Sequence, residues 1–320
     1  MLRKRALRKI FITTFTCFTL LVLYIIPTKV NDNYLETDID VIYTSSVYNS
    51  EIYLLGENNY LVKTNLMLKE DDVDDKIEEL LEHLKIDSKF TKPVGLKGII
   101  PKDTEINEVT VTGNRAVIDF DDNLLKVDKK LEERLIESIV YSTTSIAGID
   151  EVIITINGEK LSILPESRKS LPDTLTRDFG INKVYDITNR NGIQKVILYY
   201  TENISNNNYY VPVTKYLNDD RDKIKIIIDN LSSSYIYEDN LSSYLRNDVT
   251  MLDYKTSDNV MEINFNKDIF PSDKLLESVE YTLSYSIFDN YDVDKILLKV
   301  NGVDLKEINK CEFTSTCNIE

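Results

Sequence analysis

The feature that most constrains this chain is an internal repeat, because the pattern of residues 131–161 returns at residues 275–305. The last thirteen positions of the two copies align without a gap and are rich in β-branched and other apolar residues, as in a buried strand. Each run also contains an Asn-Gly pair that favours a tight turn, Asn157-Gly158 in the first copy and Asn301-Gly302 in the second. The repeat therefore predicts a duplicated domain.

An amphipathic helix is predicted before the strand in each copy. In the first copy, Leu131, Leu135, Ile136, Ile139 and Val140 share one face at helical spacing. Residues 137–141 match residues 277–281, which is an offset of 140 residues, whereas the strands are offset by 144. This alignment predicts about one additional helical turn between helix and strand in the second copy.

The rest of each repeat follows the order β-β-α-β-β-α-β. Hydrophobic spacing and turn residues in the first repeat predict a hairpin at 51–64, a helix at 72–86 and strands at 105–112 and 115–120. The corresponding segments of the second repeat are strands at 196–200 and 209–213, a helix at 219–231 and a strand at 261–265. Segments 184–188 and 194–199 predict an extra hairpin arm on the second domain.

The N-terminal segment predicts a membrane anchor. Residues 1–9 are basic, and the run from Ile10 to Ile26 contains no charged residue, which is near the shortest length that spans a bilayer core. A cleaved signal peptide is the alternative, but no small-x-small cleavage pattern follows Pro27. We therefore expect a single-pass anchor with its basic end in the cytoplasm and the following domains extracytoplasmic. The net charge of −16 makes nucleic acid an unfavourable partner.

No catalytic, cofactor-binding or metal-binding motif is present, so we expect a protein without enzymatic activity or cofactors. The chain has one histidine, His83, on a charged helix, and too few cysteines for a metal site. Acidic clusters such as Asp119 with Asp121-Asp122 are interpreted as strand ends and helix starts. A disulfide between Cys311 and Cys317 remains open, because it closes only a short loop.

Twenty tyrosines and no tryptophan raise the alternative of a carbohydrate-binding face. Several of them are expected in strands, where aromatic residues are common: Tyr43, Tyr53, Tyr199 and Tyr200.

Several segments of the first repeat resemble the GerM domain family of spore-forming Gram-positive bacteria. They are the run 116–124, the helix at 137–141 and the pieces 149–152 and 156–158, and the resemblance extends over residues 51–161 and 196–305. The resemblance implies small α/β-sandwich domains similar to the ring-building domains of secretion and sporulation channels. It also implies a non-enzymatic scaffold that acts in sporulation or germination, within a complex between mother cell and forespore.

The predicted architecture is an α+β chain with two tandem domains. The predicted division is a cytoplasmic end and anchor at 1–27, a spacer at 28–50, domain one at 51–161, a linker at 162–180, domain two at 181–307 and a tail at 308–320. The expected partners are other sporulation envelope proteins, and self-association into a ring through an exposed strand edge is a further expectation. The alternatives are a peptidoglycan-binding module with a concave tyrosine-lined face and a cell-wall hydrolase with two converging carboxylates.

Overall fold

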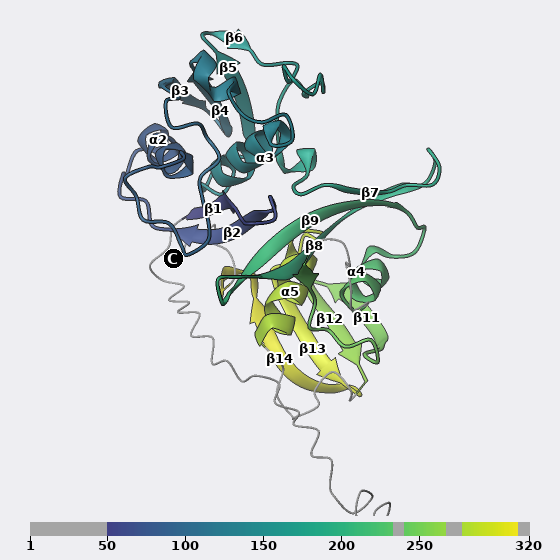
Figure 1. Cartoon of the computed structure of the whole chain (residues 1–320). Helices are drawn as coiled ribbons and strands as arrows, with labels where there is room; N and C mark the ends of the chain where they lie inside the picture. The colour runs from purple at the N-terminus through teal and green to yellow at the C-terminus, as the bar shows by residue number, and fades with distance from the viewer. Residues whose placement is uncertain (1–49, 233–239, 267–276, 313–320) are drawn as a thin grey trace, which may run out of the picture. The chain divides into compact units, whose positions relative to one another are not determined.

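The computed structural model describes residues 50–232, 240–266 and 277–312 (Figure 1). The first repeat contains a hairpin, two helices and a small sheet, in the predicted order. Its elements are β1 (Ser50–Leu55), β2 (Leu61–Leu66), α2 (Val73–Leu84), β3 (Ile106–Thr112), β4 (Arg115–Phe120), α3 (Glu132–Thr143), β5 (Glu151–Ile156) and β6 (Glu159–Lys160).

The second repeat contains the same series with a longer hairpin. Its elements are β7 (Val184–Asp186), β8 (Ile193–Ile204), β9 (Asn207–Asn218), α4 (Lys223–Ser232), β10 (Leu241–Ser242), β11 (Met251–Ser257), β12 (Val260–Phe265), α5 (Glu277–Phe288), β13 (Lys295–Val300) and β14 (Val303–Asn309). The mixed α+β class predicted from the sequence is confirmed.

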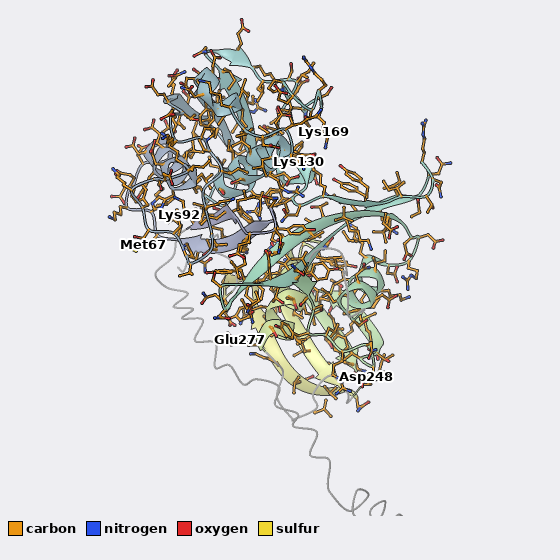
Figure 2. All side chains as sticks on the ribbon, in the orientation of Figure 1. Met67, Lys92, Lys130, Lys169, Asp248 and Glu277 are labelled. Carbon is orange, nitrogen blue, oxygen red and sulfur yellow. The ribbon has the colours of Figure 1, made fainter. Side chains whose placement is uncertain are left out.

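Each repeat has its own four-stranded mixed sheet, in the orders β3-β4-β5-β6 and β11-β12-β13-β14. The parallel pairs β4/β5 and β12/β13 are connected by α3 and α5, as parallel neighbours require. The inward positions of β4 and β12 are fully buried, as the alternation predicts: Ala116, Ile118, Phe120, Met261, Ile263 and Phe265. Charged side chains such as Lys130 and Asp248 lie at the surface (Figure 2).

Helix α3 satisfies the free edge of β1 with a row of serines. The Ser138 hydroxyl donates to the Tyr53 carbonyl at 2.7 Å, and the Tyr53 amide donates to Ser142 Oγ at 3.0 Å. One turn further, Ser145 Oγ accepts from the Glu51 amide and donates to its carbonyl. A strand edge buried against a helix needs such partners, because unpaired backbone groups are costly away from water.

Helix α5 does the same for β8 in the second repeat. The Tyr199 amide donates to Ser286 Oγ at 2.8 Å, and the Asn290 side chain accepts from the Ile197 amide and donates to the Ile197 carbonyl. Ser142 and Ser286 therefore hold equivalent places 144 residues apart, the same offset as β5 and β13. The predicted helix alignment, with an offset of 140 residues and an additional helical turn before the strand, is wrong. It followed a short match of residue types between 137–141 and 277–281, which do not hold equivalent positions.

Both Asn-Gly pairs form the predicted turns. Asn157 and Asn301 each have φ of 49°, and the glycines that follow have φ of 82° and 81°, the left-handed region that Asn and Gly tolerate best. The turns are fixed in the same way, since the Gly158 amide donates to Asp119 and the Gly302 amide donates to Asn264.

The second hairpin is longer than predicted. Strand β8 continues to Ile204, and strand β9 begins at Asn207. Ser205 and Asn206 form the two-residue turn between them, and both have positive φ. The polar run at 203–208 favours a loop by composition, but cross-strand pairing continues through it, to the pair of Ile204 with Asn207.

Two further predictions need correction. The extra arm is not a hairpin of 184–188 with 194–199, because β7 pairs in parallel with β9 instead. Helix α4 begins four residues later than predicted, since the Asp219 carboxylate accepts from the Arg221 amide and guanidinium, which is a local turn and not a helical contact.

The predicted anchor at 10–26 and spacer at 28–50 fall outside the described residues, apart from Ser50. Within the described ranges, none of the helices is long and apolar enough to cross a bilayer. The predicted linker, 162–180, contains three buried leucines, and Leu175 exchanges both backbone hydrogen bonds with Val152 of β5. It is therefore packed onto the first repeat.

Candidate functional site at the junction of the repeats

Strands of both repeats share one sheet, in the order β1-β2-β9-β8-β10, with β7 paired to β9. Strands β2 and β9 meet at Lys63 and Tyr210. Beside this meeting point, the fully buried Asn182 accepts from the Leu61 amide at 2.9 Å and donates to the carbonyls of Leu61 and Pro212 at 2.8 and 2.7 Å. One side chain therefore joins the backbones of the two hairpins.

Asn182 also connects this sheet to α3. The backbone amide of Asn182 donates at 2.9 Å to the side chain of Glu137. Glu137 is fully buried and forms ion pairs with Arg134 and Lys183. Burial raises the pKa of Glu137 above its ordinary value, although both cations act in the opposite direction. A charged group at this depth is retained because its partners are positioned around it.

A second buried ionic group lies on the face of β1 and β2. Glu51 is 3% exposed and lies 2.7 Å from Lys63 Nζ and 3.7 Å from Arg177 Nη2. Burial acts to raise the pKa of Glu51, but the charges of Lys63 and Arg177 outweigh it and hold the pKa below its ordinary value. The carboxylate is thus stabilised in its ionised form.

Tyrosines of both repeats surround these charges. Lys63 Nζ lies 4.0 Å from the ring centre of Tyr285, and the Tyr53 hydroxyl donates to Glu51 at 3.1 Å. The Tyr199 hydroxyl donates to Asp289 at 2.7 Å. Burial, followed by the nearby carboxylates, raises the pKa values of Tyr53 and Tyr199 well above the ordinary value, so both hydroxyls stay protonated.

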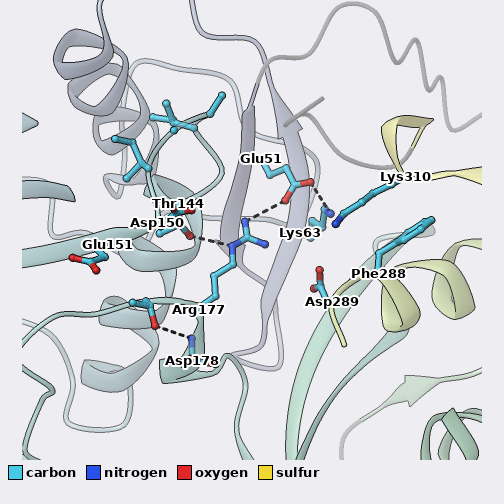
Figure 3. A pocket seen from close by; sticks show the side chains of 15 residues that line it. Glu51, Lys63, Thr144, Asp150, Glu151, Arg177, Asp178, Phe288, Asp289 and Lys310 are labelled. Carbon is cyan, nitrogen blue, oxygen red and sulfur yellow. Dashed lines mark hydrogen bonds and ion pairs between the residues drawn. The ribbon is translucent and has the colours of Figure 1, made fainter. Parts of the chain in front are cut away.

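A cavity of about 770 Å³ opens over this network (Figure 3). Its walls come from β1, β2, the loop after α3, the turn Arg177–Phe179, the end of α5 and the segment after β14. The charged residues that line it are Glu51, Lys63, Asp150, Glu151, Arg177, Asp178, Asp289 and Lys310. Its volume lies in the range of small-ligand sites.

The acids of this cavity already have partners. Asp150 accepts from Asn114 at 3.1 Å, Glu151 pairs with Arg115, and Asp178 pairs with Lys195. The hydrogen bond and charge of Lys195 hold the pKa of Asp178 below its ordinary value. A glycosidase needs instead a carboxylic acid with a raised pKa facing a second carboxylate, so the geometry does not favour the hydrolase alternative.

The acidic clusters singled out in the sequence have structural roles, as interpreted. Asp119 accepts hydrogen bonds from Thr155, Gly158 and Asn107, which hold its pKa below the ordinary value although burial acts to raise it. Asp72 caps the start of α2 by accepting from the Asp74 amide.

Three of the tyrosines expected in strands belong to the core. Tyr53, Tyr199 and Tyr200 are at most 2% exposed, so they do not line an open face, and Tyr43 lies outside the described residues. His83 stacks on Phe90 at 3.7 Å between ring centres. The described part of the chain holds no cluster of three metal-binding side chains. Cys311 is disulfide-bonded, and Cys317, the partner left open in the sequence analysis, lies outside the described ranges.

Sequence reasoning missed the junction residues Glu51, Lys63, Arg177 and Asn182. One signal was present, because Glu51 directly precedes the apolar run 52–55 of β1, whose six residues are all buried. A charged residue in such a run indicates a buried ion pair. Arg177 and Asn182 lie in or beside the connecting segment, whose lack of periodicity gave no such indication.

Comparison with known proteins gives a consistent result. The family model described as "Germane: Sporulation and spore germination" matches twice, at residues 51–162 and 197–306. The chain is 28% identical over 272 residues to the spore germination protein GerM of Bacillus subtilis, which covers 81% of this chain and 73% of that protein. The solved structure of the tandem GerMN domains of B. subtilis GerM superposes with a TM-score of 0.76 at 25% identity, covering 84% of this chain and 99% of that one. The chain belongs to the Germane family of sporulation and spore germination domains, of which it carries two copies.

Proposed function

We propose that this protein is a non-enzymatic, membrane-anchored scaffold that acts in sporulation or spore germination through protein–protein contacts outside the cytoplasmic membrane. Its partners in this proposal are other envelope proteins of a complex between mother cell and forespore. Domains at 51–161 and 181–307 carry the contacts, and residues 10–26 form the anchor.

Family membership supports the process, since the relative with 28% identity is a spore germination protein and the superposed structure is from a sporulation protein. Neither carries the name of an enzyme. The cavity over Glu51 supports the non-enzymatic part, because its acids are engaged in ion pairs and hydrogen bonds.

The observation that carries the scaffold proposal is the buried junction. Asn182 joins the two hairpins through three hydrogen bonds, and Lys63 of the first repeat lies against Tyr285 of the second. Breaking this junction exposes buried polar groups and a buried ion pair, which is costly. Two domains joined in this way are suited to hold two partner surfaces at a constant spacing.

In this proposal, self-association into a ring uses the faces of the domains and not the edges of their sheets. The edge strands β3, β11 and β14 each contain a register shift, at Ile106/Glu108, Met251/Asp253 and opposite Leu298/Lys299. Bulges of this kind are one of the means by which proteins protect sheet edges from strand addition.

The experiment is a deletion in the spore-forming host, scored for heat-resistant spores, with a fluorescent fusion of the full chain followed through sporulation. The proposal expects fewer spores and a signal that gathers at the membranes around the forespore. Complementation with Asn182→Ala should restore localisation but not full spore yield. Normal spore yield together with an even signal around vegetative cells would overturn the proposal.

A further inference from the structure

Two charged groups of the junction cavity have unused capacity for a ligand. The Arg177 side chain is 34% exposed. Its Nε donates to Thr144 at 3.1 Å, and its Nη2 donates to the Tyr141 carbonyl at 3.4 Å and lies 3.7 Å from Glu51, so Nη1 takes part in none of these three contacts. Asp289 accepts from Tyr199 through Oδ2, and among the described residues its Oδ1 accepts no hydrogen bond, which leaves this oxygen for another donor. Both residues line the same cavity (Figure 3).

The composition of the wall selects against a simple ion. The cavity is lined by the cations Lys63, Arg177 and Lys310 and by the five acids Glu51, Asp150, Glu151, Asp178 and Asp289. An anion at Arg177 meets the repulsion of the acids, and a cation at Asp289 meets the repulsion of the three basic groups. A ligand that carries both charges a few bonds apart satisfies both ends, because guanidinium binds carboxylate and carboxylate binds ammonium with charge-assisted hydrogen bonds.

The rest of the wall fits a small organic molecule. Phe288, Ile146 and Ile149 supply apolar surface, and Ala147-Gly148 brings the backbone close to the cavity with little side-chain bulk. Sites that orient a small ligand combine placed polar groups with apolar surface, and in this cavity the charged side chains outnumber the apolar ones.

We propose that this cavity binds a zwitterionic α-amino acid group, with its carboxylate on Arg177 and its ammonium on Asp289. The group can come from a free amino acid or from an amino acid end carried on a larger molecule through an amide. This inference goes beyond the scaffold role and does not depend on it.

The test is isothermal titration calorimetry of the full-length protein in detergent with two zwitterionic probes. Alanine represents the free amino acid, and Nε-acetyl-lysine represents an amino acid end attached through an amide. The controls are N-acetyl-alanine, which lacks the ammonium group, and alanine amide, which lacks the carboxylate. Binding of either zwitterion, with both blocked compounds at least about tenfold weaker, supports the proposal and identifies the source. Absence of binding by both zwitterions overturns it, and so does equal binding of the blocked compounds.

Variants locate the site. Arg177→Gln and Asp289→Asn should each weaken the bound zwitterion by about tenfold or more, as loss of one charge-assisted contact implies. Arg221→Gln is the matched control, because Arg221 is 48% exposed, pairs with Asp219 and Asp229 and is not part of the cavity wall. Unchanged affinity in both cavity variants would overturn the assignment. If a variant does not fold, the comparison of zwitterionic and blocked probes on the unaltered protein still tests whether the cavity binds a zwitterion.

Discussion

Helices α3 and α5 bond to their neighbouring strands in the same pattern, but only some of the residue types that form the hydrogen bonds are the same in the two repeats. In both repeats a serine, Ser142 or Ser286, accepts from a tyrosine amide. About one turn further along the chain, the residue types differ. Ser145 bonds to the backbone amide and carbonyl of Glu51, whereas Asn290 bonds to those of Ile197. The need to satisfy a buried strand edge is thus common to both repeats, whereas the side chain that meets it varies.

The strands beneath these helices differ more. Strand β1 carries the buried ion pair of Glu51 with Lys63, and the equivalent place in β8 is the apolar Ile197. Strand β8 has its own buried acid further along, Glu202, whose Oε2 has no hydrogen-bond partner among the described residues. The buried Glu51–Lys63 ion pair therefore belongs to the first repeat, and substitutions should affect the two strands differently.

The largest effect is expected at the ion pair. Glu51→Gln leaves Lys63 buried without a counter-charge and should lower the free energy of unfolding by about 3–5 kcal/mol at pH 7, measured by urea denaturation. Because the pKa of Glu51 is lowered in the folded state, its contribution is present above the ordinary carboxyl pKa and is lost as pH falls through the folded-state value. The difference between the variant and the unaltered protein should therefore shrink in acid. A difference independent of pH would contradict the ionic role.

Breaking the connection between the hairpins should have the next largest effect. Asn182→Ala removes three hydrogen bonds to buried backbone groups and should cost about 3 kcal/mol more than Asn206→Ala. Asn206 is a matched control, because it also has positive φ, 67° against 48°, but its side chain is exposed. Equal losses in the two variants would show that only backbone conformation matters at Asn182.

The serine contacts should respond equally in the two repeats. Ser142→Ala and Ser286→Ala each leave a buried tyrosine amide without its acceptor and should cost about 1–3 kcal/mol. Ser284→Ala is the control on the same helix as Ser286. Within the described part of the chain, Ser284 Oγ is buried without a hydrogen-bond partner, so its removal should be neutral or stabilising. Clearly unequal losses at Ser142 and Ser286 would break the equivalence.

The smallest effect is expected at Glu202, and with the opposite sign. Burial, with a smaller contribution from Glu57, raises the pKa of Glu202, so stability is lost as pH rises through the folded-state pKa. Glu202→Gln should therefore increase the free energy of unfolding by about 1 kcal/mol at pH 8 and change it little at pH 4. The exposed Glu57→Gln is the control. A loss of stability in Glu202→Gln at pH 8 would indicate a partner that stabilises the ionised carboxylate.

Much of the fold could be predicted, because it depends on the local hydrophobic pattern and on the conformations that turn residues adopt. The first hairpin, α2, β3 and β4 follow from alternation and helical spacing, and the Asn-Gly turns follow from the backbone conformation those residues tolerate. The extent of β8 and β9 could not be predicted, since pairing with a partner strand overrides the loop-like composition of residues 203–208.

The candidate site was harder to predict for a physical reason. Serines on α3 look like solvent-exposed positions in a helical pattern, and their role appears only when β1 packs against them. Arg177 is 36 residues from Tyr141 in sequence but donates to its carbonyl, and no periodicity connects such positions. Sites assembled from distant segments depend on tertiary packing, which single-sequence patterns do not encode.

The most direct test of the scaffold proposal is the distance between the two repeats in solution. Spin labels attached through non-cysteine chemistry at Lys130 and Asp248, one exposed position in each repeat, report that distance by pulsed electron resonance. A fixed junction predicts one narrow distance distribution in the unaltered protein and a broader one in Asn182→Ala. A broad distribution in the unaltered protein would contradict the claim that the two domains hold a constant spacing.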